Sequence, residues 1–141
     1  MSISYVYGKV PAQDVERARR FYEEKLGLTP KSDVNNHLRY EVGGAHFVVF
    51  PSSGSASGTH DQLGFVVDDI RATVKNLRGK GVVFEEHRVP GATIEDGIAD
   101  FGHLKAAWFK DSEGNLLNLA EGLKLGVSRE AEAAAAGRAS S

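Results

Sequence analysis

The hydrophobic residues of this chain recur with a helical period in two places, and each place begins with an aspartate. The first stretch runs from Asp14, a favourable N-cap residue, to Gly27, a favourable C-cap residue. The second begins at Asp69 and runs to Gly79 or Gly81. Each stretch is therefore predicted to be a helix.

A period of two predicts strands around both helices. The first strand ends at Pro11, which cannot donate to a ladder, and Gly43-Gly44 predicts a tight hairpin turn. The predicted strands are residues 4–10, 37–42 and 45–50 in the first half, and 62–67, 82–86, 104–110 and 115–121 in the second.

The order β-α-β-β-β thus occurs twice, joined by a Ser/Gly-rich linker over 52–59. The spacing between equivalent residues grows towards the end of the repeat, which indicates an insertion in the second half. It falls in a Gly-, Pro- and acid-rich stretch, 89–103, that is predicted to be a long loop or lid.

These elements predict an α+β domain over residues 1–122, made of two βαβββ modules in tandem at about 4–51 and 60–121. One helix per module covers one face of its sheet, so curved mixed sheets should enclose a cleft on the other face. Residues 123–141 form an Ala-rich C-terminal tail without an expected function of its own.

Strand alternation assigns side chains to the open face. In the first hairpin a two-residue turn pairs Glu41 with His46 and Arg39 with Val48, and His37 lies on the same face. In the last hairpin, Phe109 and Ala107 are predicted to share the open face with Asn118, while Trp108 packs under the helix.

The amino-acid composition argues against several classes of function. The 141 residues carry a net charge of −2, so no basic field is available for nucleic acid, and no apolar run approaches the ~20 residues of a membrane span. The absence of cysteine excludes thiolate chemistry and disulfides. The first residues lack the features of a signal peptide, so a cytoplasmic location is expected.

Three segments together resemble the vicinal oxygen chelate superfamily, which includes glyoxalase I, bleomycin-resistance proteins and extradiol dioxygenases. They are Pro11-Ala12-Gln13-Asp14-Val15-Glu16-Arg17-Ala18, Gly64-Phe65-Val66-Val67-Asp68-Asp69-Ile70 and Phe109-Lys110-Asp111-Ser112-Glu113-Gly114-Asn115-Leu116-Leu117. The resemblance spans residues 4–121. It implies paired modules around a cleft and, since two-module members commonly pair, a homodimer.

The resemblance also implies where a metal would bind. Metal-using members place His or Gln, Glu, His and Glu at positions that correspond to Tyr7, Val48, Gln62 and Asn118. Valine has no donor atom, the two amides are neutral, and a tyrosine with a pKa near ~10 would have to lose its proton. We therefore expect no metal and no other cofactor.

The favoured hypothesis is a metal-free protein of the bleomycin-resistance type that sequesters a small organic molecule in the cleft, without nucleic-acid or membrane partners. One alternative is a metal-independent isomerase, lyase or cyclase that uses Tyr7, Glu41 or His46 as acid or base. A second is a metal-dependent glyoxalase- or dioxygenase-like enzyme with a displaced site at His37, Glu41 and His46. The predicted ligand-binding residues are Tyr7, Lys9, Arg39, Val48, Phe50, Gln62, Phe109 and Asn118.

Overall fold

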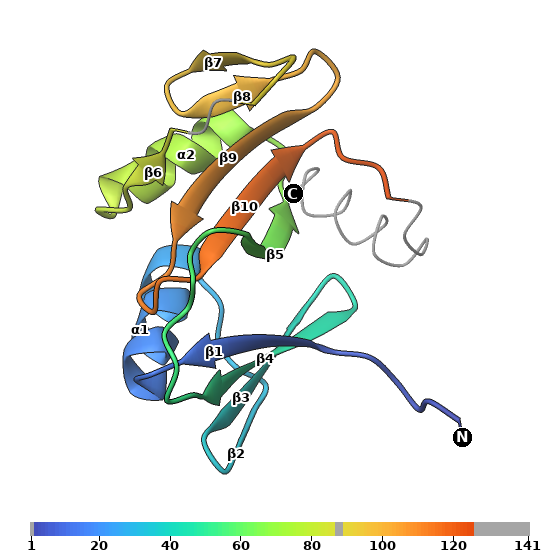
Figure 1. Cartoon of the computed structure of the whole chain (residues 1–141), viewed down its shortest axis with the longest axis vertical. Coiled ribbons are helices and arrows are strands. Elements are labelled where there is room, and N and C mark those ends of the chain that lie inside the picture. Colours follow the sequence, from blue (N-terminus) through green and yellow to red (C-terminus); the bar gives the residue numbers. More distant parts are fainter. Residues whose placement is uncertain (1, 87–88, 126–141) are drawn as a thin grey trace.

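A computed structural model describes residues 2–86 and 89–125. Within these ranges the chain forms two helices and ten strands in two mixed sheets (Figure 1). The predicted α+β architecture of two tandem modules is confirmed. None of the helices in the described ranges has the length and apolar character needed to cross a membrane.

The first module contains a four-stranded sheet with the order β1-β4-β3-β2. Its first strand pairs in parallel with its last, and β3 and β4 form the predicted hairpin. The elements are β1 (Gly8–Ala12), α1 (Val15–Leu26), β2 (Ser32–Val34), β3 (His37–Val42) and β4 (Ala45–Pro51).

The second module repeats this plan with additions. Its first strand again pairs in parallel with its last, and the sheet order is β5-β10-β9-β8-β7, with β6 also paired to β9. The elements are β5 (Asp61–Val66), α2 (Ile70–Gly79), β6 (Phe84–Glu85), β7 (Thr93–Glu95), β8 (Ile98–Asp100), β9 (Lys105–Lys110) and β10 (Leu116–Glu121).

Both helices begin at the predicted aspartates. The Asp14 carboxylate accepts a hydrogen bond from the Arg17 N–H at 3.0 Å, and Asp69 accepts one from the Ala72 N–H at 3.1 Å. These bonds satisfy N–H groups that have no partner within the helix. Helix α1 ends at Gly27, whose φ of 68° is the left-handed conformation that favours glycine.

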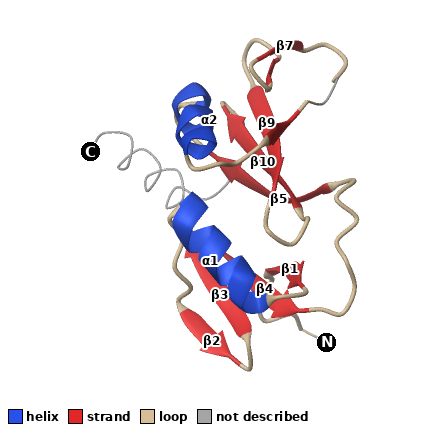
Figure 2. Cartoon of the chain, turned by 90° about the vertical axis from the view of Figure 1, so that its left-hand side faces the viewer, coloured by secondary structure: helices blue, strands red, loops and turns tan. Residues whose placement is uncertain are grey.

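The two helices lie on the same side of the molecule (Figures 1 and 2). Each buries its apolar stripe against its own sheet, α1 through Val15, Ala18 and Tyr22, and α2 through Ile70, Val74 and Leu77. The hydrophobic core therefore lies between helices and sheets, and the opposite sheet faces are free for other roles.

A buried hydrogen-bond network joins the modules. The Tyr22 hydroxyl on α1 donates to Asp111 Oδ2 at 2.8 Å, in the turn between β9 and β10. Asn115 Nδ2 donates to the same oxygen at 2.9 Å and to the Pro11 carbonyl at 2.9 Å. The segment that resembles the family's closing hairpin therefore fixes the second module to the first strand and helix of the first.

Glu113, in the same turn, meets the N-terminus of α1. Its carboxylate accepts from the Asp14 N–H at 2.9 Å and from Arg17 Nε at 2.7 Å. Burial acts to raise the pKa of Glu113, but the bonds from Arg17, the Asp14 N–H and the Ser112 hydroxyl outweigh burial and hold that pKa below its usual value.

The first strand differs from its prediction. It begins at Gly8 rather than at residue 4, and it continues through Pro11 to Ala12. Pro11 is tolerated because β1 lies at the edge of its sheet, where a missing N–H leaves no ladder bond unmade. Tyr7 consequently lies in the segment before the strand.

The predicted lid contains a hairpin instead of being only a loop. Strands β7 and β8 pair around the two-residue turn Asp96-Gly97, whose φ angles of 53° and 77° are both positive. An Asp-Gly pair is a strong signal for such a turn, and β8 adds the hairpin to the edge of β9. Most of the predicted Ala-rich tail, from residue 126 onward, lies outside the described residues.

Candidate functional site

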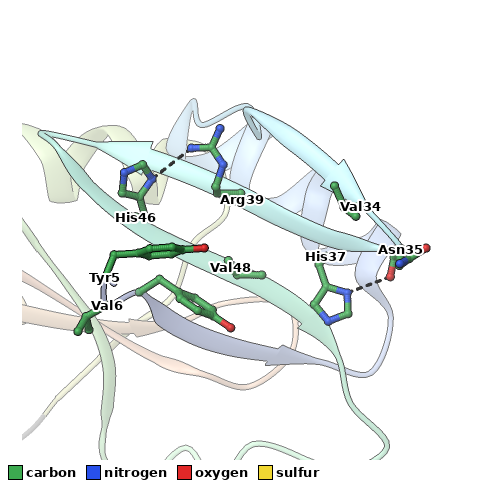
Figure 3. Close-up of a pocket in the computed structure, with 9 residues that line it drawn as sticks. Tyr5, Val6, Val34, Asn35, His37, Arg39, His46 and Val48 are labelled. Carbon is green, nitrogen blue, oxygen red and sulfur yellow. Dashed lines mark hydrogen bonds between the residues drawn. The ribbon is translucent and has the colours of Figure 1, made fainter. Parts of the chain in front are cut away.

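A groove of about 750 Å³ lies over the open face of the first sheet. Its floor is formed by side chains from β3 and β4, and one wall is the N-terminal segment before β1. Figure 3 shows Arg39 and His46 at one end, His37 and Asn35 at the other, and Val48 between them. The groove thus combines a hydrophobic middle with polar ends.

Strand alternation produces this floor. Leu38 and Tyr40 point into the core and are at most 1% exposed, so their neighbours His37 and Arg39 point to the groove. The β3–β4 register pairs Arg39 with Val48 and Glu41 with His46, which confirms the pairing predicted from Gly43-Gly44.

Arg39 is held by three neighbours. Its Nε donates to Ser32 Oγ at 3.3 Å, its Nη1 donates to His46 Nδ1 at 3.1 Å, and Nη1 lies 3.5 Å from Glu41 Oε2. The predicted Glu41–His46 pair is therefore bridged by a guanidinium. Because a guanidinium only donates, Nδ1 of His46 accepts, and the proton of the neutral ring lies on Nε2.

His37 has the opposite arrangement at the other end of the groove. Its Nδ1 lies 2.9 Å from the Asn35 carbonyl oxygen, which only accepts, so Nδ1 carries the proton. Asn35 and Asn36 have φ of 51° and 65°, a left-handed turn that asparagine tolerates, and this turn places the carbonyl beside the ring.

The wall formed by the N-terminal segment is aromatic. The rings of Tyr5 and Tyr7 lie 6.2 Å apart at an angle of 42°, and the side chain of Val6 lies beside them. Tyr5 is 76% exposed and Tyr7 43% exposed. Large aromatic surface left in water beside a groove is typical of a place where a ligand or partner binds.

The structure brings together three of the predicted ligand-binding residues, Tyr7, Arg39 and Val48, with the candidate acid or base His46. Lys9 and Phe50 lie on the same sheet but outside the groove lining, and the Lys9 ammonium sits 4.4 Å from the centre of the Phe50 ring. Their predicted role in binding stays a prediction.

Gln62 and Asn118 also lie outside the groove lining. Gln62 Nε2 donates to the Lys9 carbonyl at 2.8 Å, which connects β5 to β1, and Asn118 Nδ2 donates to the Ala107 carbonyl at 3.3 Å. These bonds use the amide nitrogens and leave the amide oxygens available to accept hydrogen bonds from a ligand. The predicted role of Gln62 and Asn118 in ligand binding therefore stays a prediction.

The expectation that Phe109 lines the open face is wrong. The connection between β9 and β10 has five residues instead of four, because Lys110 pairs with Leu116. The alternation shifts by one, so Phe109 is fully buried against Phe84 in the core. Trp108 takes its place on the open face, opposite Asn118.

Sequence reasoning missed the contributions of Tyr5, Val6, Val34 and Asn35 to the groove. Tyr5 and Val6 lie before β1, and Val34 and Asn35 belong to a short edge strand and its turn. An Asn-Asn pair before an alternating run was a usable turn signal for β2, whereas nothing in the pattern places the N-terminal segment over the sheet.

The residues at the family's metal positions are weak ligands. Val48 has no donor atom, Gln62 and Asn118 offer neutral amide oxygens while their nitrogens donate to backbone carbonyls, and Tyr7 would have to lose its proton to bind a metal. Within the ranges the structure describes, no group of three or more His, Asp or Glu side chains lies close enough together to hold a metal ion.

Comparison with known proteins gives a family. Residues 3–119 match the model of the Glyoxalase/Bleomycin resistance protein/Dioxygenase superfamily. The chain therefore belongs to this superfamily. A Glyoxylase-like domain-containing protein from Didymella fabae is 26% identical over 117 residues, which cover 76% of this chain and 84% of that protein.

Solved structures of other proteins share this fold. TnmS3, an antibiotic binding protein from Streptomyces sp. CB03234, is 25% identical with a TM-score of 0.62, over 86% of this chain and 98% of that one. FosX, a fosfomycin resistance protein from Listeria monocytogenes, is 12% identical with a TM-score of 0.67, over 89% and 94% of the two chains. The second likeness concerns the fold alone.

Proposed function

We propose that this chain is a metal-free protein that binds and sequesters a small organic molecule in the groove over the first sheet. The observation that carries the proposal is the groove itself, about 750 Å³ in volume with aromatic and aliphatic walls and a few polar groups. This size and composition are typical of small-molecule sites. The lack of strong metal ligands at the family positions supports binding without a metal.

One relative supports a binding role. TnmS3 is described as an antibiotic binding protein, and it matches nearly its whole length to this chain. The superfamily also contains enzymes, so family membership does not decide between binding and turnover.

A metal-independent isomerase, lyase or cyclase is the second candidate. Tyr7 and His46 both line the groove, which favours this alternative. Glu41 contacts Arg39 and not His46, so the carboxylate–imidazole pair expected of a general base is interrupted. A metal-dependent enzyme would need His37, Glu41 and His46 as a displaced site, and the described residues form no such cluster.

Two substitutions test the location of the site. Val48→Trp fills the middle of the groove, whereas Val66→Trp adds the same ring to β5 at a position that is 57% exposed and outside the groove. Purified wild type and variants are titrated by calorimetry with 6-hydroxy-2-naphthoate and with neutral 6-(hydroxymethyl)-2-naphthol. We expect saturable binding of at least one compound at one per chain, lost in Val48→Trp and kept in Val66→Trp.

Three results would contradict the proposal. Failure of both compounds to bind removes the binding role of the groove. Loss of binding in Val66→Trp but not in Val48→Trp places the site on the second sheet, near Gln62 and Asn118. Chemical conversion of a bound compound, or one Zn, Ni, Fe or Mn per chain after dialysis, favours one of the two enzymes instead.

A further inference from the structure

The formal charge among the residues that line the groove is positive. Arg39 is the formally charged side chain of the lining, and none of the residues that line the groove is Asp or Glu. Glu41, on the same strand, lies 3.5 Å from Arg39 Nη1 but outside the lining. Arg39 can therefore form a charge-assisted hydrogen bond with an anionic group, and it cannot form one with a cationic group.

The Arg39 guanidinium is also held in place by hydrogen bonds. Its Nε and Nη1 are bonded to Ser32 and His46, which restricts rotation of the guanidinium plane. Within the described ranges, its Nη2 forms no hydrogen bond. That amino group carries two N–H donors, which suit the oxygens of a carboxylate.

The two histidines differ in which ring nitrogen carries the proton. His46 accepts from Arg39 at Nδ1, so its own N–H lies at Nε2, on the side of the ring away from Arg39. His37 donates at Nδ1 and so presents an accepting Nε2 when its ring is neutral. One end of the groove therefore donates hydrogen bonds and the other end accepts them.

The middle of the groove fits a flat ring system. Val48 forms the floor, and the Tyr5 and Tyr7 rings form the wall, with Tyr5 mostly exposed. Aromatic side chains pair favourably with other rings in stacked or edge-to-face arrangements. A planar ligand would remove much of this aromatic surface from water.

We infer that the groove takes planar aromatic carboxylates, with the carboxylate at Arg39 and His46, the ring between Tyr5 and Val48, and a hydroxyl group at the His37 end. This inference rests on the proposed function, because it names the ligand class of the same groove. It specifies which end of the ligand lies at which end of the groove, and neither the family nor the size of the groove specifies this orientation.

The test compares charge at constant ring size. The full-length chain is titrated with 6-hydroxy-2-naphthoate, with neutral 6-(hydroxymethyl)-2-naphthol and with cationic 6-(aminomethyl)-2-naphthol. We expect the carboxylate to bind about tenfold or more tightly than the neutral compound, because a charge-assisted bond to arginine forms with it alone. The cation should bind weakest. The preference should shrink at high salt, because the Arg39 side chain is 39% exposed.

Variants separate the ring contribution from the charge contribution. Arg39→Met should bring the affinity for the carboxylate down to that for the neutral compound, while Tyr5→Leu should weaken both by a similar factor. Arg71→Met is the matched control, because Arg71 lies on α2 in the second module and pairs with Glu95 at 3.7 Å. The control should keep the wild-type preference.

The outcomes distinguish this inference from the proposed function. Saturable binding of the naphthols without a preference for the carboxylate, or a preference that survives Arg39→Met, overturns the ligand class and leaves the binding role intact. No saturable binding of any of the three compounds up to the millimolar range overturns both.

Discussion

Tyr22 on α1 and Tyr40 on β3 pack against each other with ring centres 5.5 Å apart at an angle of 46°, and their hydroxyl groups have different surroundings. Tyr22 donates to the Asp111 carboxylate at 2.8 Å. The Tyr40 hydroxyl is buried, and no described residue forms a hydrogen bond with it. The two residues therefore offer a matched pair in which the same substitution removes a used and an unused hydroxyl.

We predict that Tyr22→Phe lowers the free energy of unfolding by about 1.5–3 kcal/mol, because a hydrogen bond to a charged group is lost and Asp111 loses one of its donors. Tyr40→Phe should change it by less than about 0.5 kcal/mol or increase it, since the lost hydroxyl had no partner. Urea denaturation of both variants measures the difference. Equal destabilisation of the two would contradict the hydrogen-bond assignment.

The same tyrosines predict how stability depends on alkaline pH. Burial raises the pKa of Tyr40 to about 12, and burial followed by the charge of Asp111 raises the pKa of Tyr22 well above its usual value. A raised pKa in the folded state contributes stability that is complete below the unfolded value near ~10 and is lost as pH rises above it. We expect the denaturation midpoint to fall between about pH 10 and 12, and to fall less steeply in Tyr40→Phe.

At the scale of elements, the chain leaves β10 through a glycine that has no room for a side chain. Gly122 has φ of 83°, and a Cβ atom there would collide with the His103 carbonyl oxygen. Gly44, in the β3–β4 turn, has the same φ of 83° and open space around the corresponding position. Comparing the two glycines therefore separates the cost of a left-handed side chain from the cost of a steric clash.

We predict that Gly44→Ala costs roughly 1 kcal/mol, the ordinary cost of a left-handed alanine, and that Gly122→Ala costs clearly more, because the segment before β9 must move. Thermal denaturation compares the two variants with the wild type. A Gly122→Ala protein as stable as Gly44→Ala would mean that the His103 segment yields at little cost.

The hairpin turns explain which parts of the fold and groove could be predicted. Gly43-Gly44 makes a two-residue turn, so simple alternation placed Arg39 opposite Val48 and Glu41 opposite His46, as found. The β9–β10 turn is one residue longer because the Asp111 carboxylate accepts from the N–H groups of Glu113 and Asn115. That local bonding reversed the predicted faces of Phe109 and Trp108.

The N-terminal part of the groove had no comparable signal. Tyr7 was predicted from the family resemblance and does line the groove, but Tyr5 and Val6 belong to a segment with no strand pairing. The path of such a segment depends on contacts with residues far along the chain, which one sequence does not reveal. The Asp96-Gly97 turn, in contrast, was a readable signal within a stretch that was predicted only as a loop or lid.

At the scale of the whole molecule, apolar side chains remain exposed on the faces that the helices do not cover. Tyr5, Val6, Val34 and Val66 are between 57% and 83% exposed. Tyr5, Val6 and Val34 lie together along the groove, and exposed apolar residues near one another favour association with a partner. A second copy of the chain is the partner we expect from the two-module arrangement.

We predict a homodimer whose interface buries well above ~1,000 Å². Light scattering at high micromolar concentration measures the mass directly, and Val66→Glu should shift the equilibrium towards the monomer if β5 contributes to the interface. A wild-type mass equal to one chain at that concentration would contradict the prediction.

The hydrogen bonds between the two modules have a consequence for folding during synthesis. Tyr22 lies 89 residues before its partner Asp111, and Asp14 lies 99 residues before Glu113. During synthesis from the N-terminus, the first module can pair its strands once β4 has left the ribosome, yet its helix still lacks these partners. The Tyr22 hydroxyl and the N–H of the N-cap residue Asp14 must stay hydrated until the β9–β10 hairpin emerges, so final closure of the two modules is tied to the synthesis of that hairpin.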